Sequence, residues 1–253
     1  MKKLLVLVSA LAIAAPVLAE QAHVRSTAPL VVGAVSHVLL PTSAFANGQF
    51  GAVFKTKLSI ANVTGTQYSI RAGFSTGAGE VSARSITIRP YETLTYQNFL
   101  DEVFQTTGAG AIDFDSGNTS NRFIVSAQVY VDGPNGRFST AVQSADEAGT
   151  IINGRPGYVV GVSANSFDRT NVGCASDSGN SQTITVQVYS ASNQSLGSLP
   201  PITLGPYSWT QVGMNIGVTD GILIISSTQR AVCYGVVVDN VSNDGTFQLA
   251  VPD

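Results

Sequence analysis

The chain has 253 residues, of which 44% are apolar and 11% are charged, and its formal net charge is −3. This hydrophobic content excludes a disordered chain, which would combine low hydrophobicity with more charge. Two cysteines are too few for a small disulfide-stapled scaffold, and the negative charge excludes a strongly basic nucleic-acid-binding protein.

Residues 1–19 have the pattern of a cleaved signal peptide. Two lysines follow the initial methionine, an apolar stretch over 4–15 comes next, and Val17 and Ala19 are the small residues that a signal peptidase reads. The apolar stretch is too short for a membrane span, which takes about 20 residues. We therefore expect cleavage before Glu20 and an exported mature chain without a membrane span, which is periplasmic, bound to the cell surface or secreted.

The segment 20–36 precedes the first predicted repeat and contains an apolar run, Ala28–Val35. This run is predicted either to form the first strand of its own domain or to add as a strand to the edge of a neighbouring subunit. The second alternative would allow the protein to associate with itself.

The rest of the chain alternates between apolar and polar residues with a period of two, as β-strands do. The clearest runs are Lys57–Ile60, Tyr68–Ala72, Thr183–Val188 and Gly221–Ile225. Turn signals recur every 8–12 residues or so, a spacing that predicts an all-β fold of antiparallel β-sandwiches rather than βαβ units.

Four sequence motifs occur twice in the same order, which indicates an internal repeat. The matching pairs are Lys55–Leu58 with Arg169–Val172, Ile86–Tyr91 with Ile202–Tyr207, Val125–Asp132 with Val232–Asp239, and Gly136–Val142 with Gly245–Val251. We therefore predict two tandem β-sandwich domains, 37–145 and 157–253, each long enough for its own core. A linker containing Gly and Pro is expected between them, over 145–156.

One element is expected to differ between the copies. Asn98–Phe104 carries apolar residues at helical spacing behind an Asn cap, which predicts one or two helical turns that close an end of the first sandwich. The matching segment Gly213–Gly217 is expected to remain a loop.

The openings and ends of the strands carry a family likeness. An aromatic residue, a basic residue and a threonine open a strand at Val53–Thr56 and at Phe167–Thr170, and a long strand ends in Asp or Asn at Val238–Asn240. In this pattern the chain resembles tandem Ig-like repeats of exported bacterial proteins of unassigned function. The second copy departs from it by placing Asp168 between the aromatic and the basic residue. The resemblance implies an Ig-like fold for each copy and no particular activity or site.

Both cysteines lie in the second copy, on two strands that are candidates for neighbours. In an oxidising compartment, Cys174 and Cys233 are expected to form a disulfide, and two buried free thiols are the alternative. The first copy has Ile60 at the position of Cys174, and Ser126 at the position of Cys233 if the strands align without a gap.

Few residues suit catalysis. His23 and His37 lie before or at the start of the first copy, so both copies lack the histidines of zinc sites and of most Ser-His-Asp arrangements. A lone, exposed side chain is the expected state of His37, and Lys55 and Lys57 are expected to face solvent. We therefore predict that the protein is not an enzyme and holds no cofactor or metal centre. Its scattered basic residues predict no nucleic-acid binding.

Acidic residues allow two other interpretations, a glycosidase site and a calcium site. Asp113 and Asp115 would lie on one strand face about 7 Å apart, which suits a glycosidase or, with Asn118, a weak calcium site. A solvated strand end is the simpler interpretation. A second oxygen-rich loop with equally low specificity for calcium contains Asp239, Asn243 and Asp244.

Aromatic residues at the repeated turn offer a route to ligand binding. Trp209 follows the turn at Pro206–Tyr207, and Tyr91 takes the matching turn in the first copy. Exposed rings at these positions could stack on sugars, whereas buried rings would serve packing, which is the more frequent state of tryptophan.

Together these patterns predict an exported, non-catalytic structural or adhesion-type protein of the cell surface or periplasm. Its partner would be a protein or a glycan. The alternative is a carbohydrate-binding module or a carboxylate-based glycosidase.

Overall fold

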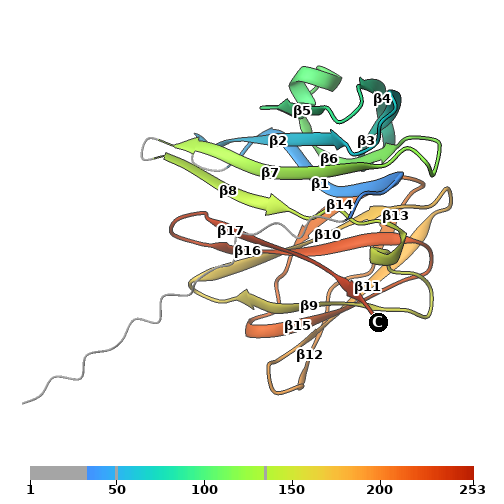
Figure 1. Cartoon of the computed structure of the whole chain (residues 1–253). Coiled ribbons are helices and arrows are strands. Elements are labelled where there is room, and N and C mark those ends of the chain that lie inside the picture. Colours follow the sequence, from blue (N-terminus) through green and yellow to red (C-terminus); the bar gives the residue numbers. More distant parts are fainter. Residues whose placement is uncertain (1–32, 49–50, 134–135) are drawn as a thin grey trace, which may run out of the picture.

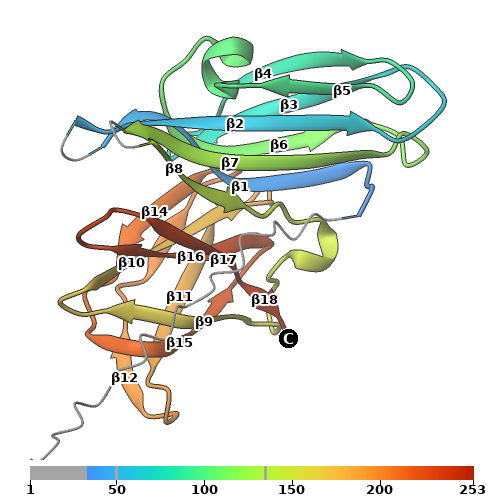
Figure 2. The ribbon, with the colours of Figure 1, turned by 60° about the vertical axis from the view of Figure 1, so that its left-hand side comes forward.

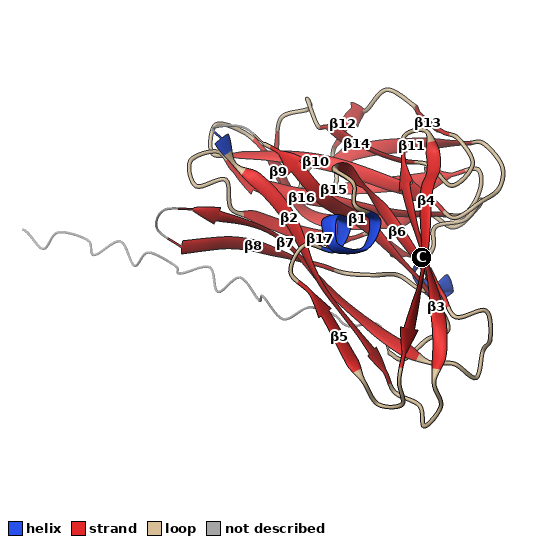
Figure 3. Ribbon diagram, turned by 90° about the horizontal axis from the view of Figure 1, so that it is seen from above, coloured by secondary structure: helices blue, strands red, loops and turns tan. Residues whose placement is uncertain are grey.

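The computed structural model describes residues 33–48, 51–133 and 136–253 (Figure 1). The predicted signal peptide and most of the segment 20–36 lie outside these residues. Strands dominate the described chain, as Figure 3 shows, and they form antiparallel sheets of eight, four and six strands. The prediction of an all-β fold is confirmed.

The first half of the chain contributes the eight-stranded sheet. Its strands are β1 (His37–Asn47), β2 (Val53–Asn62), β3 (Tyr68–Thr76), β4 (Gly79–Ile88), β5 (Thr93–Tyr96), β6 (Gly108–Asp115), β7 (Phe123–Gly133) and β8 (Gly136–Val142). β1 pairs with β6 along most of its length and with β2 only at its last residues. The sheet therefore bends into two layers, β4-β3-β6-β1 and β5-β2-β7-β8, which share one apolar core.

The second half contributes the other two sheets. Its strands are β9 (Gly157–Ala164), β10 (Asp168–Ser176), β11 (Gln182–Tyr189), β12 (Ser195–Ser198), β13 (Ile202–Leu204), β14 (Trp209–Gly213), β15 (Val218–Ser227), β16 (Ala231–Asp239), β17 (Gly245–Leu249) and β18 (Val251–Pro252). One sheet has the order β12-β11-β15-β9-β18, with β13 also on β11, and the other has the order β14-β10-β16-β17. A second apolar core lies between them.

The strand pairing of the second half follows that of the first. β11 lies between β12 and β15 as β3 lies between β4 and β6, and β10 lies between β14 and β16 as β2 lies between β5 and β7. The hairpin β16–β17 takes the place of β7–β8. Equivalent residues of the two halves can therefore be assigned by their strand partners.

The strand partners show that Ser126 is not the residue of the first half that corresponds to Cys233. By the motif that the two strands share, Ser59 of β2 corresponds to Gly173 of β10. Ser59 pairs with Ser126, and Gly173 pairs with Tyr234. Ser126 thus corresponds to Tyr234 and not to Cys233, so the strands do not align without a gap. The shift matters because one residue along a strand moves a side chain to the opposite face of the sheet.

The predicted disulfide is confirmed. Cys174 of β10 and Cys233 of β16 are direct cross-strand partners whose Cα atoms lie 4.1 Å apart, and their sulfur atoms are 2.08 Å apart. Both side chains are buried in the second core. Ile60 and Val125 are the corresponding partners in the first half. The disulfide indicates an oxidising, extracytoplasmic environment.

The predicted helical turn is present as a single π-helical turn, η2 (Leu100–Phe104). Its cap residue is Phe99 rather than the expected Asn98, and no side chain caps the turn. Asn98 donates through its backbone N–H to Glu102 Oε1 at 2.7 Å. Phe99 is fully buried and closes an end of the first core. The matching segment Gly213–Gly217 has no helix, as predicted, and places Met214 in the second core.

The two halves pack directly on each other (Figures 1 and 2). The sheet β14-β10-β16-β17 turns its outer face toward β1, β6 and β8 of the first half. Tyr234 and Phe247, stacked with ring centroids 5.0 Å apart, join the apolar cluster of the first half. Beside them, Thr140 Oγ1 donates to the carbonyl oxygen of Gly245 at 2.8 Å. A further apolar cluster, which contains members of both halves, consists of Leu39, Ala111, Ala145, Ala175 and Val232.

Tyr234 is the largest fully buried side chain at this contact. Its hydroxyl donates to Gln211 Oε1 at 2.9 Å and accepts from Trp209 Nε1 at 3.2 Å. Its ring lies over Gly173, where a Cβ atom would come within 2.1 Å of the ring carbon Cζ. Burial raises the pKa of the Tyr234 hydroxyl, which therefore stays a protonated donor at neutral pH.

The segment between the halves is held at both ends. Ala145 exchanges backbone hydrogen bonds of 2.8 Å with Leu39, and Ile151 exchanges backbone hydrogen bonds of 2.8 and 3.0 Å with Ala231. A single 3₁₀ turn, η3 (Glu147–Gly149), lies between these two anchor points. The segment is thus part of the packed structure.

Candidate functional site

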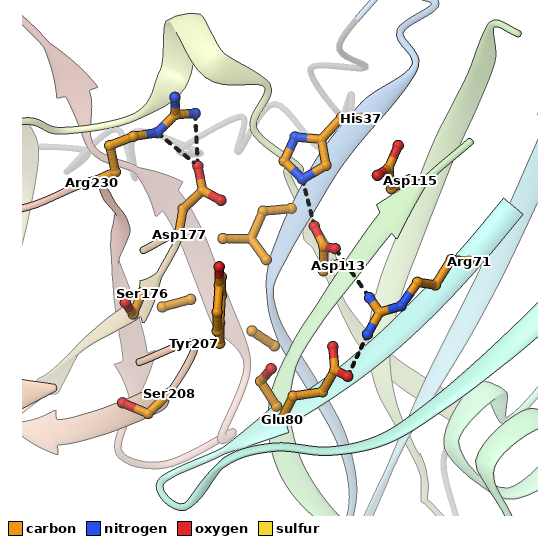
Figure 4. Close-up of a pocket in the computed structure, with 14 residues that line it drawn as sticks. His37, Arg71, Glu80, Asp113, Asp115, Ser176, Asp177, Tyr207, Ser208 and Arg230 are labelled. Carbon is orange, nitrogen blue, oxygen red and sulfur yellow. Dashed lines mark hydrogen bonds and ion pairs between the residues drawn. The ribbon is translucent and has the colours of Figure 1, made fainter. Parts of the chain in front are cut away.

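A cleft with a volume of about 660 Å³ opens where the two halves meet (Figure 4). Its lining comes from β1, β3, β4 and β6 of the first half, and from β10 and three loops of the second. Leu39, Ala111 and Ala175, which belong to the apolar contact between the halves, form part of the lining. The other lining residues are mostly charged or hydroxyl-bearing.

One wall of the cleft is a row of charged side chains from the first half. The register of β1 and β6 places His37 opposite Asp115, and Asp113 lies two residues away on the same face. His37 Nε2 is 2.6 Å from Asp113 Oδ1, and Arg71 Nη1 is 3.6 Å from Asp113 Oδ2. Arg71 of β3 also forms an ion pair with Glu80 of β4. The row thus links four strands.

His37 is a paired group and not the lone exposed histidine that the sequence predicts. The hydrogen bond with Asp113 raises the pKa of His37, whereas partial burial lowers it to a smaller extent. The negative charges of Asp113, Asp177 and Asp115 also favour the protonated ring. The side chain remains 36% exposed toward the cleft.

The opposite wall comes from the second half. Arg230 donates from Nε and Nη2 to Asp177 Oδ2 at 3.0 and 2.8 Å, and from Nη1 to Glu147 Oε1 at 2.9 Å. Arg230 thereby ties this wall to η3, between the halves. Ser176 and Ser208 complete the wall, and the N–H of Ser176 donates to the carbonyl oxygen of Ser208 at 2.7 Å.

Tyr207 is the exposed aromatic residue of the cleft. Its ring stands between the two walls in Figure 4 and is 52% exposed. Its backbone is left-handed, with φ 48°, and its N–H donates to the carbonyl oxygen of Ser178 at 3.0 Å. The matching Tyr91 has φ 55°, a corresponding bond of 3.2 Å to Thr64, and 74% exposure. Tyr91 does not line the cleft.

Trp209, the other aromatic candidate, is half-buried. Its indole N–H donates to the buried Tyr234 hydroxyl at 3.2 Å, and its ring packs against the apolar cluster that joins the halves. The structure therefore favours the packing alternative for Trp209, and it places Tyr207 where a ring could meet a ligand.

The oxygen atoms proposed as calcium ligands have other partners. Asp113 is held by His37 and Arg71, and one side-chain oxygen of Asp115 accepts from a backbone N–H two residues later. In the second loop, Asp239 accepts from two backbone N–H groups, and Asn243 accepts from Arg169. Across 33–48, 51–133 and 136–253, no three His, Cys, Asp or Glu side chains are placed to hold a metal ion.

Comparison with known proteins identifies no family, because no family model matches the chain and no curated protein matches it. The helices in the described part of the chain are all too short or too polar to cross a membrane. The interpretation of the cleft therefore depends on its own geometry.

Proposed function

We propose that the protein is an exported, non-catalytic structural or adhesion-type protein of the cell surface or periplasm. It would consist of two tandem Ig-like domains, 37–145 and 157–253, after a cleaved signal peptide over 1–19. The observation that carries the proposal is the contact between the halves, where Tyr234 is fully buried. An apolar contact of this kind, with clusters that contain residues of both halves, opposes relative domain motion. The two halves would therefore act as one stiff body.

The disulfide and the strand pairing support the location and the domain type. A buried cross-strand disulfide between Cys174 and Cys233 suits an oxidising compartment. Each half has two packed antiparallel layers with the same pairing order, which is the general plan of Ig-like sandwiches. An export signal at the start of the chain would explain how the protein reaches that compartment.

The environment of the cleft acids favours a non-catalytic role over the glycosidase alternative. A glycosidase needs a carboxyl group that stays protonated in an apolar setting as the general acid. Asp113 instead lies between His37 and Arg71, at 2.6 and 3.6 Å. One Asp115 oxygen is committed to the turn that follows β6, where it accepts from Gly117 N–H at 2.7 Å.

Fractionation of bacteria that express the full chain with a C-terminal tag tests this proposal. The tagged protein is expected outside the cytoplasm, with Glu20 as its first residue and with both thiols resistant to alkylation until reduction. A Leu11→Arg variant is the matched control, because a charge within the apolar stretch 4–15 should stop export. Retention of the uncleaved wild-type chain in the cytoplasm would contradict the proposal.

A further inference from the structure

We propose that the cleft between the two halves binds neutral, hydroxyl-rich sugar rings, with Tyr207 as the ring against which a sugar stacks. This inference deepens the adhesive part of the proposed function by naming a ligand class, and it rests on that function for the protein's location outside the cytoplasm. Trp209 and Tyr91 are the aromatic candidates that the sequence suggests, and the inference assigns the role instead to Tyr207 of the repeated turn.

The size and lining of the cleft suit a small organic ligand. Its volume of about 660 Å³ lies within the range of about 300–1,000 Å³ that is usual for ligand sites. Apolar groups of Leu39, Ala111 and Ala175 contribute to the lining, and polar groups from both halves surround them. A ligand in this position would contact both halves at once.

The charges that line the cleft favour a neutral ligand. Three groups that can carry positive charge, Arg71, Arg230 and His37, face four carboxylates, so one carboxylate is in excess even when His37 is protonated. The four carboxylates are Glu80, Asp113, Asp115 and Asp177. An anion would meet this excess of negative charge. A cation would have to compete with the arginines for carboxylates that they already hold. Sugar hydroxyls can donate to carboxylates and accept from guanidinium groups, so a neutral polyol can use both signs.

Tyr207 is positioned by its backbone and leaves half of its surface open. Its N–H donates to the carbonyl oxygen of Ser178 at 3.0 Å. Its hydroxyl oxygen lies beside Gly179, where a Cβ atom would be 3.2 Å from that oxygen. The residue is 52% exposed and stands between the charged walls in Figure 4. Tyrosine suits such a place because its ring offers an apolar face and its hydroxyl offers a polar end.

The chain contains a matched control for this role. Tyr91 sits in the equivalent turn of the first half, with φ 55° against 48° for Tyr207, and it lies outside the cleft. Replacing either tyrosine by alanine imposes a similar change on a left-handed, exposed position. A difference in ligand affinity between Tyr207→Ala and Tyr91→Ala therefore reflects the loss of the ring from the cleft and not a change in the turn.

The experiment uses the purified chain on an array of immobilised neutral, acidic and amino-sugar oligosaccharides, followed by titration calorimetry with the best neutral hit. Binding to neutral glycans is expected. Tyr207→Ala should weaken it by about tenfold or more, as for an aromatic anchor of an interface, and Tyr91→Ala should leave it unchanged. Near-ultraviolet circular dichroism of both variants checks that they are folded.

Two results would overturn the inference: no neutral glycan is retained, whether or not charged glycans are, or wild type and Tyr207→Ala bind with equal affinity. Either result leaves the proposed function standing if the tagged chain is found outside the cytoplasm with its disulfide formed. Conversely, glycan binding by a chain that stays in the cytoplasm would refute the proposed function and retain the site.

Discussion

Replacement of Tyr234 by alanine tests whether the two halves form one mechanical unit. The ring is fully buried, stacks on Phe247 at 5.0 Å and carries two hydrogen bonds. Truncation of a buried aromatic side chain to alanine costs about 3–5 kcal/mol of folding free energy, because it leaves a cavity that the surrounding strands only partly fill. Tyr234→Phe, which keeps the ring and removes the hydroxyl, should cost about 1–2 kcal/mol.

Urea denaturation followed by two probes measures this effect. The single tryptophan of the chain, Trp209, is bonded to Tyr234 and reports on the contact by fluorescence, whereas far-ultraviolet circular dichroism reports on all strands. The two curves should coincide in the wild type and separate in Tyr234→Ala, where the halves unfold independently. Tyr207→Ala, at an exposed position, is the control and should change stability by no more than about 0.5 kcal/mol. A loss below about 1 kcal/mol in Tyr234→Ala, with coincident curves, would refute the reasoning.

Three further changes have definite outcomes. Replacing Cys174 and Cys233 by alanine opens a loop whose ends are 59 positions apart. The chain-entropy relation then gives a loss of about 4 kcal/mol in the free energy of unfolding, measured by urea denaturation. A loss under about 1 kcal/mol would contradict this relation. The raised pKa of His37 means that its ion pair with Asp113 stabilises the fold fully below the unfolded pKa of about 6.5 and ceases to do so as pH rises through the folded value. Between pH 5.5 and 8.5, the free energy of unfolding of the wild type should therefore fall by about 0.2–1 kcal/mol relative to that of His37→Gln. An equal stability difference between wild type and His37→Gln at both pH values would argue against it. Gly173→Ala places a methyl group against the Tyr234 ring and should cost about 1–3 kcal/mol, whereas an unchanged midpoint would show that the ring moves freely.

The features that follow from local pattern could be predicted from the sequence. Period-two alternation is a property of neighbouring residues, and it correctly predicts the strands around Thr183–Val188 and Gly221–Ile225. The helical turn at Leu100–Phe104 follows from apolar spacing within one segment. The disulfide between Cys174 and Cys233 needed only two cysteines on candidate neighbouring strands and an oxidising compartment.

The candidate site could not be predicted because its parts are remote in the sequence. His37 and Asp113 are 76 positions apart, and they meet only because β1 pairs with β6 in one register. A pattern that identifies each strand does not reveal which strands pair or how they align. The sequence does identify the turn that contains Tyr207, because that turn is repeated. It does not reveal that Tyr207 faces a cleft whereas Tyr91 does not, because this difference depends on how the two halves pack.

The packing itself has a signal in the sequence once equivalent residues are aligned by strand partners. On the outer face of the four-stranded sheet β14-β10-β16-β17, Gly173 and Tyr234 pair across β10 and β16. The first half has Ser59 and Ser126 at those positions. β16 is therefore apolar on both faces, as a strand buried between two layers must be. A gap-free alignment conceals this difference, because it matches Ser126 with a cysteine of the core face.

The same comparison explains why the second half uses this face in the contact between the halves and the first half does not use the equivalent one. The ring of Tyr234 can lie flat on β10 only because Gly173 has no side chain, so these two positions form a matched pair. In the first half, Ser59 lies on the equivalent face, and its hydroxyl is bonded to the exposed Thr95 at 2.9 Å. Docking that face against another sheet would bury hydroxyl groups in exchange for little apolar area. The two halves thus share a strand plan but use different faces in the contact. The second half contributes the face of β10 and β16 that carries Tyr234, whereas the first half contributes Leu39 of β1 and Ala111 of β6.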